Sequence, residues 1–411
     1  MVRHFITALD IGTSTVQVVV AERIRGESNL RILGVGVATS AGVRRGVVVD
    51  LEEVTASVRR AVEEARRSSG VPIRSAWLSV GGSHISISSS KGVVAVSRAD
   101  GEISPEDVRR AIAAAETFIP KNPNKEILHM IPRDFKVDQE AGIKDPVGMH
   151  GVRLEVDSLI IECSTPFLKN IFKCVEGAGL KVEDYVFSPL AAAEAVLTKR
   201  QKELGVMLLD IGGGTASFIV FEESMPIHAG VVPIGGGHIT ADVAIGFRTH
   251  IDVAERIKLA HGSCLPSAFN KKDVVRMAEF IPEQTAVISQ RELAEIVEAR
   301  LRDIFELLQK ELKKIDRKHL LPAGVILVGG SSALPGVLEL TRQELGLPVE
   351  IGMPHTAGVV ADASVAPSFA SVLGVLEWAS SRMREPHSAL SDHTSRIGQS
   401  KWFRWLKSLL P

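Results

Sequence analysis

The sequence is poor in cysteine and in aromatic residues, carries no excess of either charge, and has no long apolar run. Its three cysteines, Cys163, Cys174 and Cys264, are too few and too widely spaced for a disulfide framework or a four-ligand zinc site, so we expect buried thiols in a reducing compartment. Lys and Arg total 48 against 49 Asp and Glu, and the formal charge of -1 predicts no nucleic-acid partner. No run of about 18 apolar residues is present, which predicts that no helix spans a membrane. The first residues lack the apolar core of a signal peptide, and a cytoplasmic protein is therefore expected.

With 411 residues and a hydrophobic content of 45%, the chain can bury a large core, and its length suggests two or three domains. Strand-like and helix-like segments alternate along it. Residues 51–69 have the periodicity of a helix, and the following "SAWLSVGG" is typical of a strand. Ser104 and Pro105 mark the start of another helix, with Asp107 placed for a capping box. The stretch "RELAEIVEARLRDIFELLQKELKKI" predicts a long amphipathic helix. This alternation indicates an α/β architecture.

One turn occurs twice. The stretches "FITALDIGTSTVQVVVAER" and "GVMLLDIGGGTASFIVFEE" each consist of two β-rich runs joined by a turn rich in Gly and Thr, which is the pattern of a hairpin. Asp10 and Asp210 lie 200 residues apart, and each ends an apolar strand and precedes Ile-Gly. A pattern that returns at this distance indicates two related lobes.

The repeated turn has the chemistry of a phosphate site. Glycines after a strand let backbone N–H groups approach phosphate oxygens, because no Cβ blocks them. A carboxylate just before each turn can hold a hydrated Mg²⁺. A single turn of this kind is explained equally well as a simple tight turn. Two of them favour a phosphate clamp, in which both turns bind the same phosphate chain. A third element, "GVILVGGSSALPGV", is an apolar strand ending in Gly-Gly-Ser, which suits a flat base or sugar.

These three motifs, in this order, resemble the phosphate and adenosine motifs of the superfamily of actin, sugar kinases and DnaK-type chaperones. The resemblance implies an actin-like two-lobed ATPase fold that binds ATP and Mg²⁺ between its lobes. It places the first phosphate loop at Gly12, Thr13, Ser14 and Thr15, and the second at Gly212, Gly213, Gly214 and Thr215. It also implies that Asp10 and Asp210 face the metal through water, and that Gly329, Gly330, Ser331, Glu255 and Lys258 surround the adenosine. Glu255 and Lys258 equally fit an ordinary ion pair on a helix surface.

Two positions depart from the superfamily pattern. In "SPLAAAEAVL", Ser188 stands where the chaperones and the actin-like filament protein MreB have a water-orienting Glu and actin has a Gln. The phosphate-loop lysine of actin falls at Gln17. Loss of a group that positions the attacking water lowers the rate by a factor of about 10²–10⁴. We therefore expect nucleotide binding and at most slow ATP hydrolysis.

Four further stretches, "GGSHISISSSKGVVAVS", "LHMIPRDFKVD", "GIKDPVGMHGVRLEVDSLIIECS" and "VPIGGGHITADVAIGFRT", resemble the FtsA family of bacterial cell-division proteins from about Phe5 onward. The resemblance implies an inserted 1C domain that makes polymer contacts and binds other division proteins. It also implies a helical 2B domain that binds the C-terminal tail of the tubulin-like protein FtsZ. The positions matching the docking helix include Arg291 and Arg300, and we expect the tail to bind through a face that contains both, although both equally fit a solvated helix face.

The predicted organisation follows from these matches. Lobe I comprises residues 1–82 and 161–199 (1A), with the 1C domain at 83–160 inserted between them. Lobe II comprises 200–241 and 318–366 (2A), with the helical 2B domain at 242–317. A return helix to lobe I is expected at 367–379, a flexible linker at 380–399 and a terminal helix at 400–411.

The last stretch, "KWFRWLKSLLP", contains two of the four tryptophans. On a helix its apolar residues share one face, which comprises Trp402, Phe403, Trp405, Leu406, Leu409 and Leu410. The opposite face is basic, and a polar tether precedes the segment. A helix docked on the protein's own core would show a similar stripe, but these features favour the surface of an anionic membrane. The FtsA family resemblance implies such a membrane-targeting helix.

We therefore expect a structural adaptor that binds ATP, polymerises on the inner membrane face and ties FtsZ filaments to the membrane at the division site. Two alternatives share the fold: a small-molecule kinase, and a pilus-assembly ATPase of the PilM type. A kinase needs a catalytic acid or base beside an acceptor pocket, and no convincing candidate lies near either loop. The tether and terminal helix argue against the PilM type.

Overall fold

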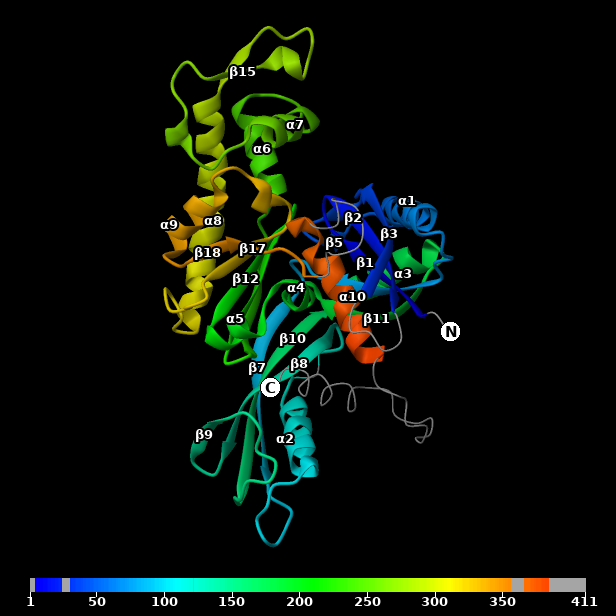
Figure 1. Cartoon of the computed structure of the whole chain (residues 1–411), viewed down its shortest axis with the longest axis vertical. Coiled ribbons are helices and arrows are strands. Elements are labelled where there is room, and N and C mark those ends of the chain that lie inside the picture. The colour runs from blue at the N-terminus through cyan, green and yellow to red at the C-terminus, as the bar shows by residue number, and fades with distance from the viewer. Residues whose placement is uncertain (1–3, 24–29, 121, 356–365, 384–411) are drawn as a thin grey trace.

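A computed structural model describes residues 4–23, 30–120, 122–355 and 366–383. It contains two five-stranded sheets, one in each predicted lobe (Figure 1). The sheet of lobe I has the order β11 (Lys181–Phe187), β6 (Ser75–Val80), β1 (His4–Ile11), β2 (Thr15–Arg23) and β3 (Leu30–Thr39). The sheet of lobe II has the order β18 (Val349–Ile351), β17 (Val325–Val328), β12 (Val206–Ile211), β13 (Ala216–Glu222) and β14 (Met225–Val232).

The two sheets have the same pairing pattern. In lobe I, β1 pairs antiparallel with β2 and parallel with β6, while β2 pairs antiparallel with β3 and β6 parallel with β11. In lobe II, β12, β13, β17, β14 and β18 repeat these relations in the same places. The predicted two-lobed α/β fold, with a hairpin after each repeated Asp, is therefore confirmed.

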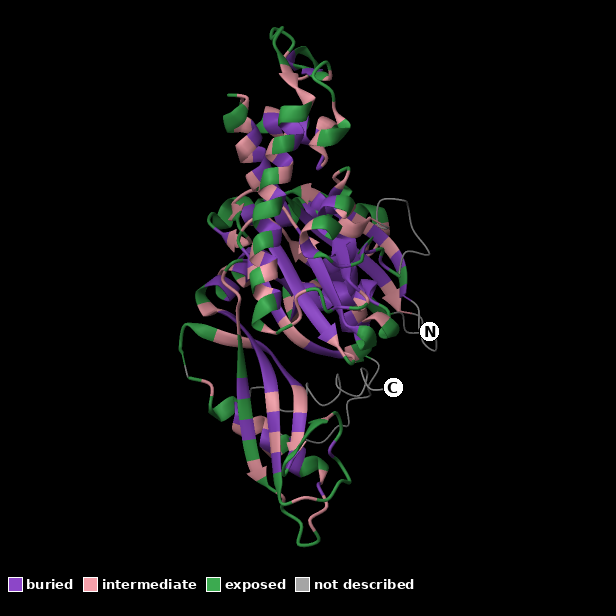
Figure 2. Ribbon diagram, turned by 90° about the vertical axis from the view of Figure 1, so that its left-hand side faces the viewer, coloured by how far each residue is buried: buried purple, intermediate pink, exposed green. Residues whose placement is uncertain are grey.

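Helices α4 (Ser188–Val196) and α10 (Ala370–Met383) lie between the lobes, and their residues share one core with strands of both sheets. Gly374 allows their close crossing, because a Cβ there would lie 1.8 Å from the carbonyl oxygen of Ala191. In lobe I, α1 (Leu51–Ser69) packs on β2, β3 and α3 (Thr165–Gly177). Figure 2 shows that buried residues concentrate in these central layers.

The inserted domain forms one end of the elongated molecule, below lobe II in Figure 1. Its sheet has the order β7 (Ser86–Ala95), β10 (Arg153–Ser164), β8 (Lys125–Val137) and β9 (Glu140–Ile143), and α2 (Pro105–Thr117) packs on it. The expected capping box begins α2: the Asp107 amide donates to Ser104 Oγ at 3.3 Å, and the Ser104 amide donates to Asp107 Oδ2 at 2.9 Å. Arg133 of β8 donates to the Ile227 carbonyl of β14 at 3.0 Å, which fastens this domain to lobe II.

A largely helical unit forms the opposite end. It contains α6 (Gly236–Gly246), α7 (Ile251–His261), the short strands β15 (Val274–Arg276) and β16 (Val287–Ser289), and the predicted long helix α8 (Gln290–Lys314). Lobe II also includes α5 (Lys199–Leu204) and α9 (Val337–Leu345). The predicted limits at 160 and 241 fall inside β10 and α6, and α10 continues four residues beyond the expected end at 379. In α10 the last turn is held by Arg382, which donates to Asp184 Oδ2 of β11 at 2.9 Å and lies over the ring of Trp378.

His129 joins three parts of the molecule. It comes from β8, its Nε2 accepts the backbone N–H of Phe187 at 2.9 Å, and its ring meets the edge of Trp378 in α10 with centroids 5.6 Å apart. The side chain is buried, and burial, followed by the positive charge of Arg382, lowers its pKa to about 3. Nε2 must stay unprotonated to accept that hydrogen bond.

We expect His129 to make the protein less stable in acid. The pKa is about 6.5 in the unfolded chain and about 3 in the folded one, so only the unfolded state gains this proton as the pH falls below 6.5. The free energy of unfolding should drop by about 2 kcal/mol between pH 6.5 and pH 5 from this group alone. Urea denaturation of wild type and His129→Gln measures it. A variant that loses as much stability over this interval as wild type would contradict the assignment.

Candidate nucleotide-binding site

The two repeated turns have the same geometry. In the first, the N–H of Gly12 donates to the carbonyl of Thr15 at 2.9 Å, and in the second, the N–H of Gly212 donates to that of Thr215 at 3.0 Å. Each bond closes a tight turn directly after the strand in which the aspartate is the last residue but one. Antiparallel pairing of β1 with β2 and of β12 with β13 holds both turns in place.

The structure brings these turns together across the gap between the lobes. A Cβ on Gly213 would lie 2.0 Å from Ser14 Oγ, and a Cβ on Gly214 would lie 2.4 Å from Thr13 Oγ1. Residues 200 positions apart in the chain therefore meet with no room for another methyl group. The predicted first and second phosphate loops form a single clamp with one half from each lobe.

A third glycine loop backs this clamp, and the sequence did not identify it as part of the site. The N–H groups of Gly236 and Gly237 donate to the carbonyls of Gly212 and Gly213 at 2.8 and 2.7 Å. A Cβ on Gly235 would lie 2.5 Å from the Gly212 oxygen. Three consecutive glycines before a helix were a usable signal, because such a loop allows close backbone approach at a helix N-terminus.

The residues expected around adenosine also converge. A Cβ on Gly236 would lie 2.7 Å from Ser331 Oγ and 3.8 Å from Lys258 Nζ. Lys258 is 8% exposed, and its Nζ donates to Glu255 Oε2 at 2.7 Å and to Thr240 Oγ1 at 2.9 Å. This is not an ordinary pair on a helix surface, because the lysine is buried under the first turn of α6.

The strand end after β17 adjoins the same place. Gly329 has a φ of 87°, and a Cβ there would lie 2.3 Å from Asp210 Oδ1. Gly330 and Ser331 begin the following 3-10 turn, and Gly330 has open space where its Cβ would be. Bare backbone thus lies beside the second aspartate, as expected for a surface that receives a flat group.

Neither aspartate forms an ion pair with a Lys, Arg or His side chain in the described part of the chain. Burial raises the pKa of Asp10 against the opposing effect of its hydrogen bond from Ser79. Burial, and then the charge of Asp10, raises the pKa of Asp210 to about 6, while Ser371 donates to its Oδ2 at 3.2 Å. Two desolvated carboxylates, of which Asp10 raises the pKa of Asp210, provide a site that a divalent cation would stabilise.

The two departures from the superfamily pattern lie close by. Gln17 pairs with Asp10 across the β1–β2 hairpin, is 4% exposed, and leaves its Oε1 without a hydrogen-bond partner in the part of the chain that the structure describes. A metal-bound water would supply the missing donor. Ser188 is the first residue of α4, and a Cβ on Gly81 would lie 2.8 Å from its Oγ. Within the described ranges no three His, Cys, Asp or Glu residues cluster as metal ligands.

The two predicted partner arginines lie on α8 but not on one face. They are nine residues apart, which is about 180° around a helix axis. Arg291 forms an exposed ion pair with Glu295 at 3.1 Å. Arg300 points toward α6, where its Nε and Nη2 donate to Asp242 at 2.7 and 2.9 Å, and it also pairs with Asp303 at 2.9 Å. The expectation of a shared face is therefore wrong, and Arg300 has a structural partner.

The predicted linker beyond Met383 and the whole terminal helix, including Trp402, lie outside the described residues. In the ranges that are described, no helix combines the length and apolarity needed to cross a bilayer.

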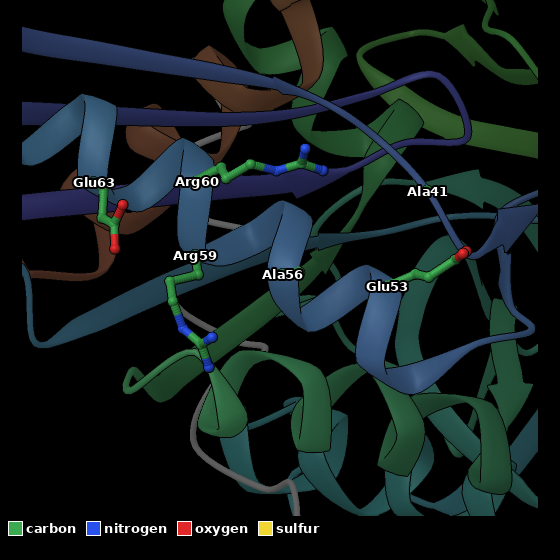
Figure 3. Close-up of a pocket in the computed structure, with 6 residues that line it drawn as sticks. All are labelled: Ala41, Glu53, Ala56, Arg59, Arg60 and Glu63. Carbon is green, nitrogen blue, oxygen red and sulfur yellow. The ribbon is translucent and has the colours of Figure 1, made fainter.

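A separate pocket lies on α1, lined by Ala41, Glu53, Ala56, Arg59, Arg60 and Glu63 (Figure 3). None of its lining residues belongs to the phosphate loops. Arg59 donates to the Gly177 carbonyl at 2.9 Å and Arg60 to that of Thr39 at 3.3 Å. Both guanidinium groups therefore brace α1 against its neighbours.

Comparison with known proteins shows which family this chain is similar to. The family model "Cell division protein FtsA" matches residues 207–374, and the model "SHS2 domain inserted in FTSA" matches residues 82–162. The cell division protein FtsA of Pseudomonas aeruginosa is 36% identical over 372 residues, covering 90% of this chain and 88% of that protein. The FtsA of Bacillus subtilis is 39% identical, with coverage of 86% and 79%.

Solved structures support the fold at lower identity. A PilM-PilN type IV pilus biogenesis complex aligns with a TM-score of 0.67 at 18% identity, covering 93% of this chain and 99% of that one. MreB 5 of Spiroplasma citri bound to AMPPNP aligns with a TM-score of 0.52 at 12% identity, covering 92% and 97%. The predicted actin-like fold with an inserted domain is confirmed.

Proposed function

Because the chain belongs to the FtsA family of cell division proteins, we propose that it is an ATP-binding actin-like protein that polymerises on the inner membrane face and anchors FtsZ filaments at the septum. The nucleotide part of this proposal rests on the clamp of glycine loops from both lobes, with one partly buried aspartate in each half. The backbone N–H groups and paired carboxylates of this clamp suit a phosphate chain with a metal ion. The structural neighbour titled as bound to AMPPNP supports this assignment.

In this proposal ATP lies between the lobes. Thr13, Ser14 and the glycines of both loops contact its phosphates, and Gly329, Gly330, Ser331, Glu255 and Lys258 surround its adenosine. Asp10, Asp210 and Gln17 hold a hydrated Mg²⁺, which neutralises phosphate charge. Since α4 and α10 connect the lobes beside this site, bound nucleotide would fix the angle between them.

We expect slow ATP hydrolysis, below roughly 1 s⁻¹, whereas kinases reach about 1–100 s⁻¹. The reason is that Ser188 at the start of α4 lacks the reach of the Glu or Gln that orients water in relatives. Ser188→Glu should match or exceed the wild-type turnover in a phosphate-release assay, and Ser188→Ala should equal it. A wild-type rate within the kinase range would contradict a mainly conformational role for the site and would favour the small-molecule kinase alternative.

We also propose that the C-terminal tail of FtsZ binds the helical unit on α8. Arg291 and Arg300 should be tested separately, because a tail lying on one side of this helix can contact only one of them. One of the two variants, Arg291→Glu or Arg300→Glu, should weaken binding of a tail peptide about tenfold, as expected for loss of one charge-assisted contact. Fluorescence anisotropy measures the affinity, and nucleotide affinity should not change.

Arg300→Glu also places a carboxylate against Asp242, so it needs a control for structure. The double variant Asp242→Arg with Arg300→Asp restores the ion pair with its direction reversed. If tail binding returns in that variant, Arg300 acts through the fold of α6 and α8. If neither single variant changes the affinity, the tail binds elsewhere.

The remaining parts of the proposal concern assembly. The family and the fold support self-association into filaments and contacts of the inserted domain with other division proteins. The terminal segment with its Trp and Phe face would hold the filament at an anionic membrane. A PilM-type role has support from the fold alone, whereas the FtsA models and relatives match at the level of sequence.

A further inference from the structure

A short hairpin touches the candidate phosphate site. Between β3 and α1 the chain forms β4 (Val43–Arg44) and β5 (Val47–Val48), with Arg45 and Gly46 at the tip. The N–H of Gly46 donates to Thr13 Oγ1 at 2.9 Å. A Cβ on Gly214 would lie 2.8 Å from Arg45 Cα. The tip thus contacts the first phosphate loop and the second one together.

Arg45 has an unusual backbone for an arginine. Its φ is 52°, in the left-handed region that glycine occupies readily and most other residues avoid. Gly46, which follows, also has a positive φ, of 72°. A glycine at both positions would form this turn without strain, so the turn itself gives no reason for a long cationic side chain at the first of them. Six other non-glycine residues in the described part of the chain also have a positive φ, Arg248 among them, so the role of Arg45 is argued from its contacts and its charge.

The charge of Arg45 is available to a ligand. The side chain is exposed, and it has no ion-pair partner in the described part of the chain. Its positive charge is one of the influences that, after burial, lower the pKa of His238 in the first turn of α6. The guanidinium therefore lies within electrostatic range of the loop of Gly235–Gly237 that backs the second phosphate loop.

The other charged side chains placed at this site are carboxylates or are already paired with one. Asp10 and Asp210 bring two carboxylates to it, and Gln17 occupies the position where actin carries a phosphate-loop lysine. Lys258 lies under α6 and is already paired with Glu255 at 2.7 Å. A nucleoside triphosphate bound to the clamp would place its most negative group, the terminal phosphate, where the two loops and the hairpin tip meet.

The same tip is tied to the inserted domain. The N–H of Ser83 donates to the carbonyl of Arg45 at 3.1 Å, and a Cβ on Gly46 would lie 2.6 Å from Gly82 Cα. Gly82 and Ser83 lead directly from β6 of lobe I into β7 of the inserted domain. Any shift of Arg45 that accompanies ligand binding would act on this connection.

We propose that Arg45 contacts the terminal phosphate of a bound nucleoside triphosphate, so that the β4–β5 hairpin distinguishes ATP from ADP and passes that difference to the start of the inserted domain. The inference rests on the proposed nucleotide function. A guanidinium matches phosphate oxygens with paired N–H donors, and ADP lacks the group that it would contact.

Arg45→Gly tests this directly, because glycine relaxes the φ of 52° and removes only the side chain. The variant should melt at the wild-type temperature or above it. Its affinity for Mg·ATP should fall about tenfold, and its affinity for Mg·ADP should stay at the wild-type value. Titration with fluorescent ATP and ADP analogues measures both. Arg44→Ala, on the adjacent strand, is the matched control and should change neither affinity, while Arg45→Lys should recover part of the ATP preference.

Amide hydrogen exchange at Ser83 gives a second readout. Its protection should differ between the ATP and ADP complexes of wild type, and this difference should vanish in Arg45→Gly. An unchanged ratio of ATP to ADP affinity in Arg45→Gly would overturn the proposal while leaving nucleotide binding intact. Failure of wild type to bind either nucleotide would instead overturn the proposed function itself.

Discussion

Gly213→Val should abolish nucleotide binding, with a loss of affinity on the order of a hundredfold or more. The added Cβ would lie 2.0 Å from Ser14 Oγ and 3.1 Å from Ser14 Cβ, and the two valine methyl groups would reach further. Because Gly213 and Ser14 belong to different lobes, the clash would push the halves of the clamp apart. Overpacking of this kind costs about 1–3 kcal/mol, and a hundredfold loss corresponds to about 2.7 kcal/mol.

Gly212→Ala is the matched control for this experiment. Its Cβ would find Thr215 O at 3.5 Å, an ordinary contact, so it would not push the lobes apart, and its loss of affinity should be smaller than that of Gly213→Val because it reports only on the approach of phosphate to the loop. Isothermal titration with Mg·ATP compares the two variants, and thermal melts establish that both are folded. Wild-type affinity in a folded Gly213→Val protein would show that the clamp is not the phosphate site.

Trp402→Glu should release the protein from anionic liposomes, reducing the bound fraction to background while ATP affinity is unchanged. The substitution removes one large apolar side chain, whose full burial contributes roughly 1.5–3 kcal/mol. It also places a carboxylate on the apolar face of the predicted helix, where contact with the membrane interface is unfavourable. The predicted helix would have little affinity to spare, because ordering the backbone of a helix costs about 1–2 kcal/mol per residue. Its three basic residues contribute about 1 kcal/mol each near an anionic leaflet. Co-sedimentation with vesicles that contain an anionic lipid measures the effect.

Ser408→Glu is the matched control, since it adds the same charge on the basic face of the predicted helix. It should weaken binding only a few fold through electrostatics. Filament formation should strengthen binding, because each added subunit brings another tethered helix, and avidity rises by a factor of about 10²–10⁴. A variant that does not polymerise but keeps the helix should therefore bind vesicles less well. Equal binding by that variant would mean that one helix is a sufficient anchor.

Local patterns in the sequence predicted local structure well. The two hairpins after Asp10 and Asp210, the helix at Leu51–Ser69 and the capping box of Ser104 all depend on residues close in the chain. Propensity, capping and period act over a few residues, so they can be read without a fold. The repeat of one hairpin at a distance of 200 residues then indicated two similar lobes, and the identical pairing of both sheets agrees with it.

Local patterns did less well where neighbours decide the outcome. The end of α10 was placed at 379, but the helix continues to Met383, and Arg382 in this last turn pairs with Asp184 of β11 at 2.9 Å. Arg300 was expected to face a partner, although Asp242 of α6 holds its side chain. Lys258 looked compatible with a surface pair, yet the first turn of α6 covers it. In each case the deciding contact comes from an element that the local sequence does not contain.

By itself, then, the sequence determined the types of the elements, the two carboxylates and the glycines available to a phosphate chain, because residue type alone fixes charge, hydrogen-bonding capacity and the absence of a Cβ. Only the tertiary structure decided which of these glycines oppose each other, since the pairing of Ser14 with Gly213 results from two sheets packed on α4 and α10. The same packing added the loop of Gly235–Gly237 and the tip at Arg45 to the site. A backbone contact of this kind has no signature in residue type, because any residue carries the N–H and carbonyl that make it, and only the fold sets their distance.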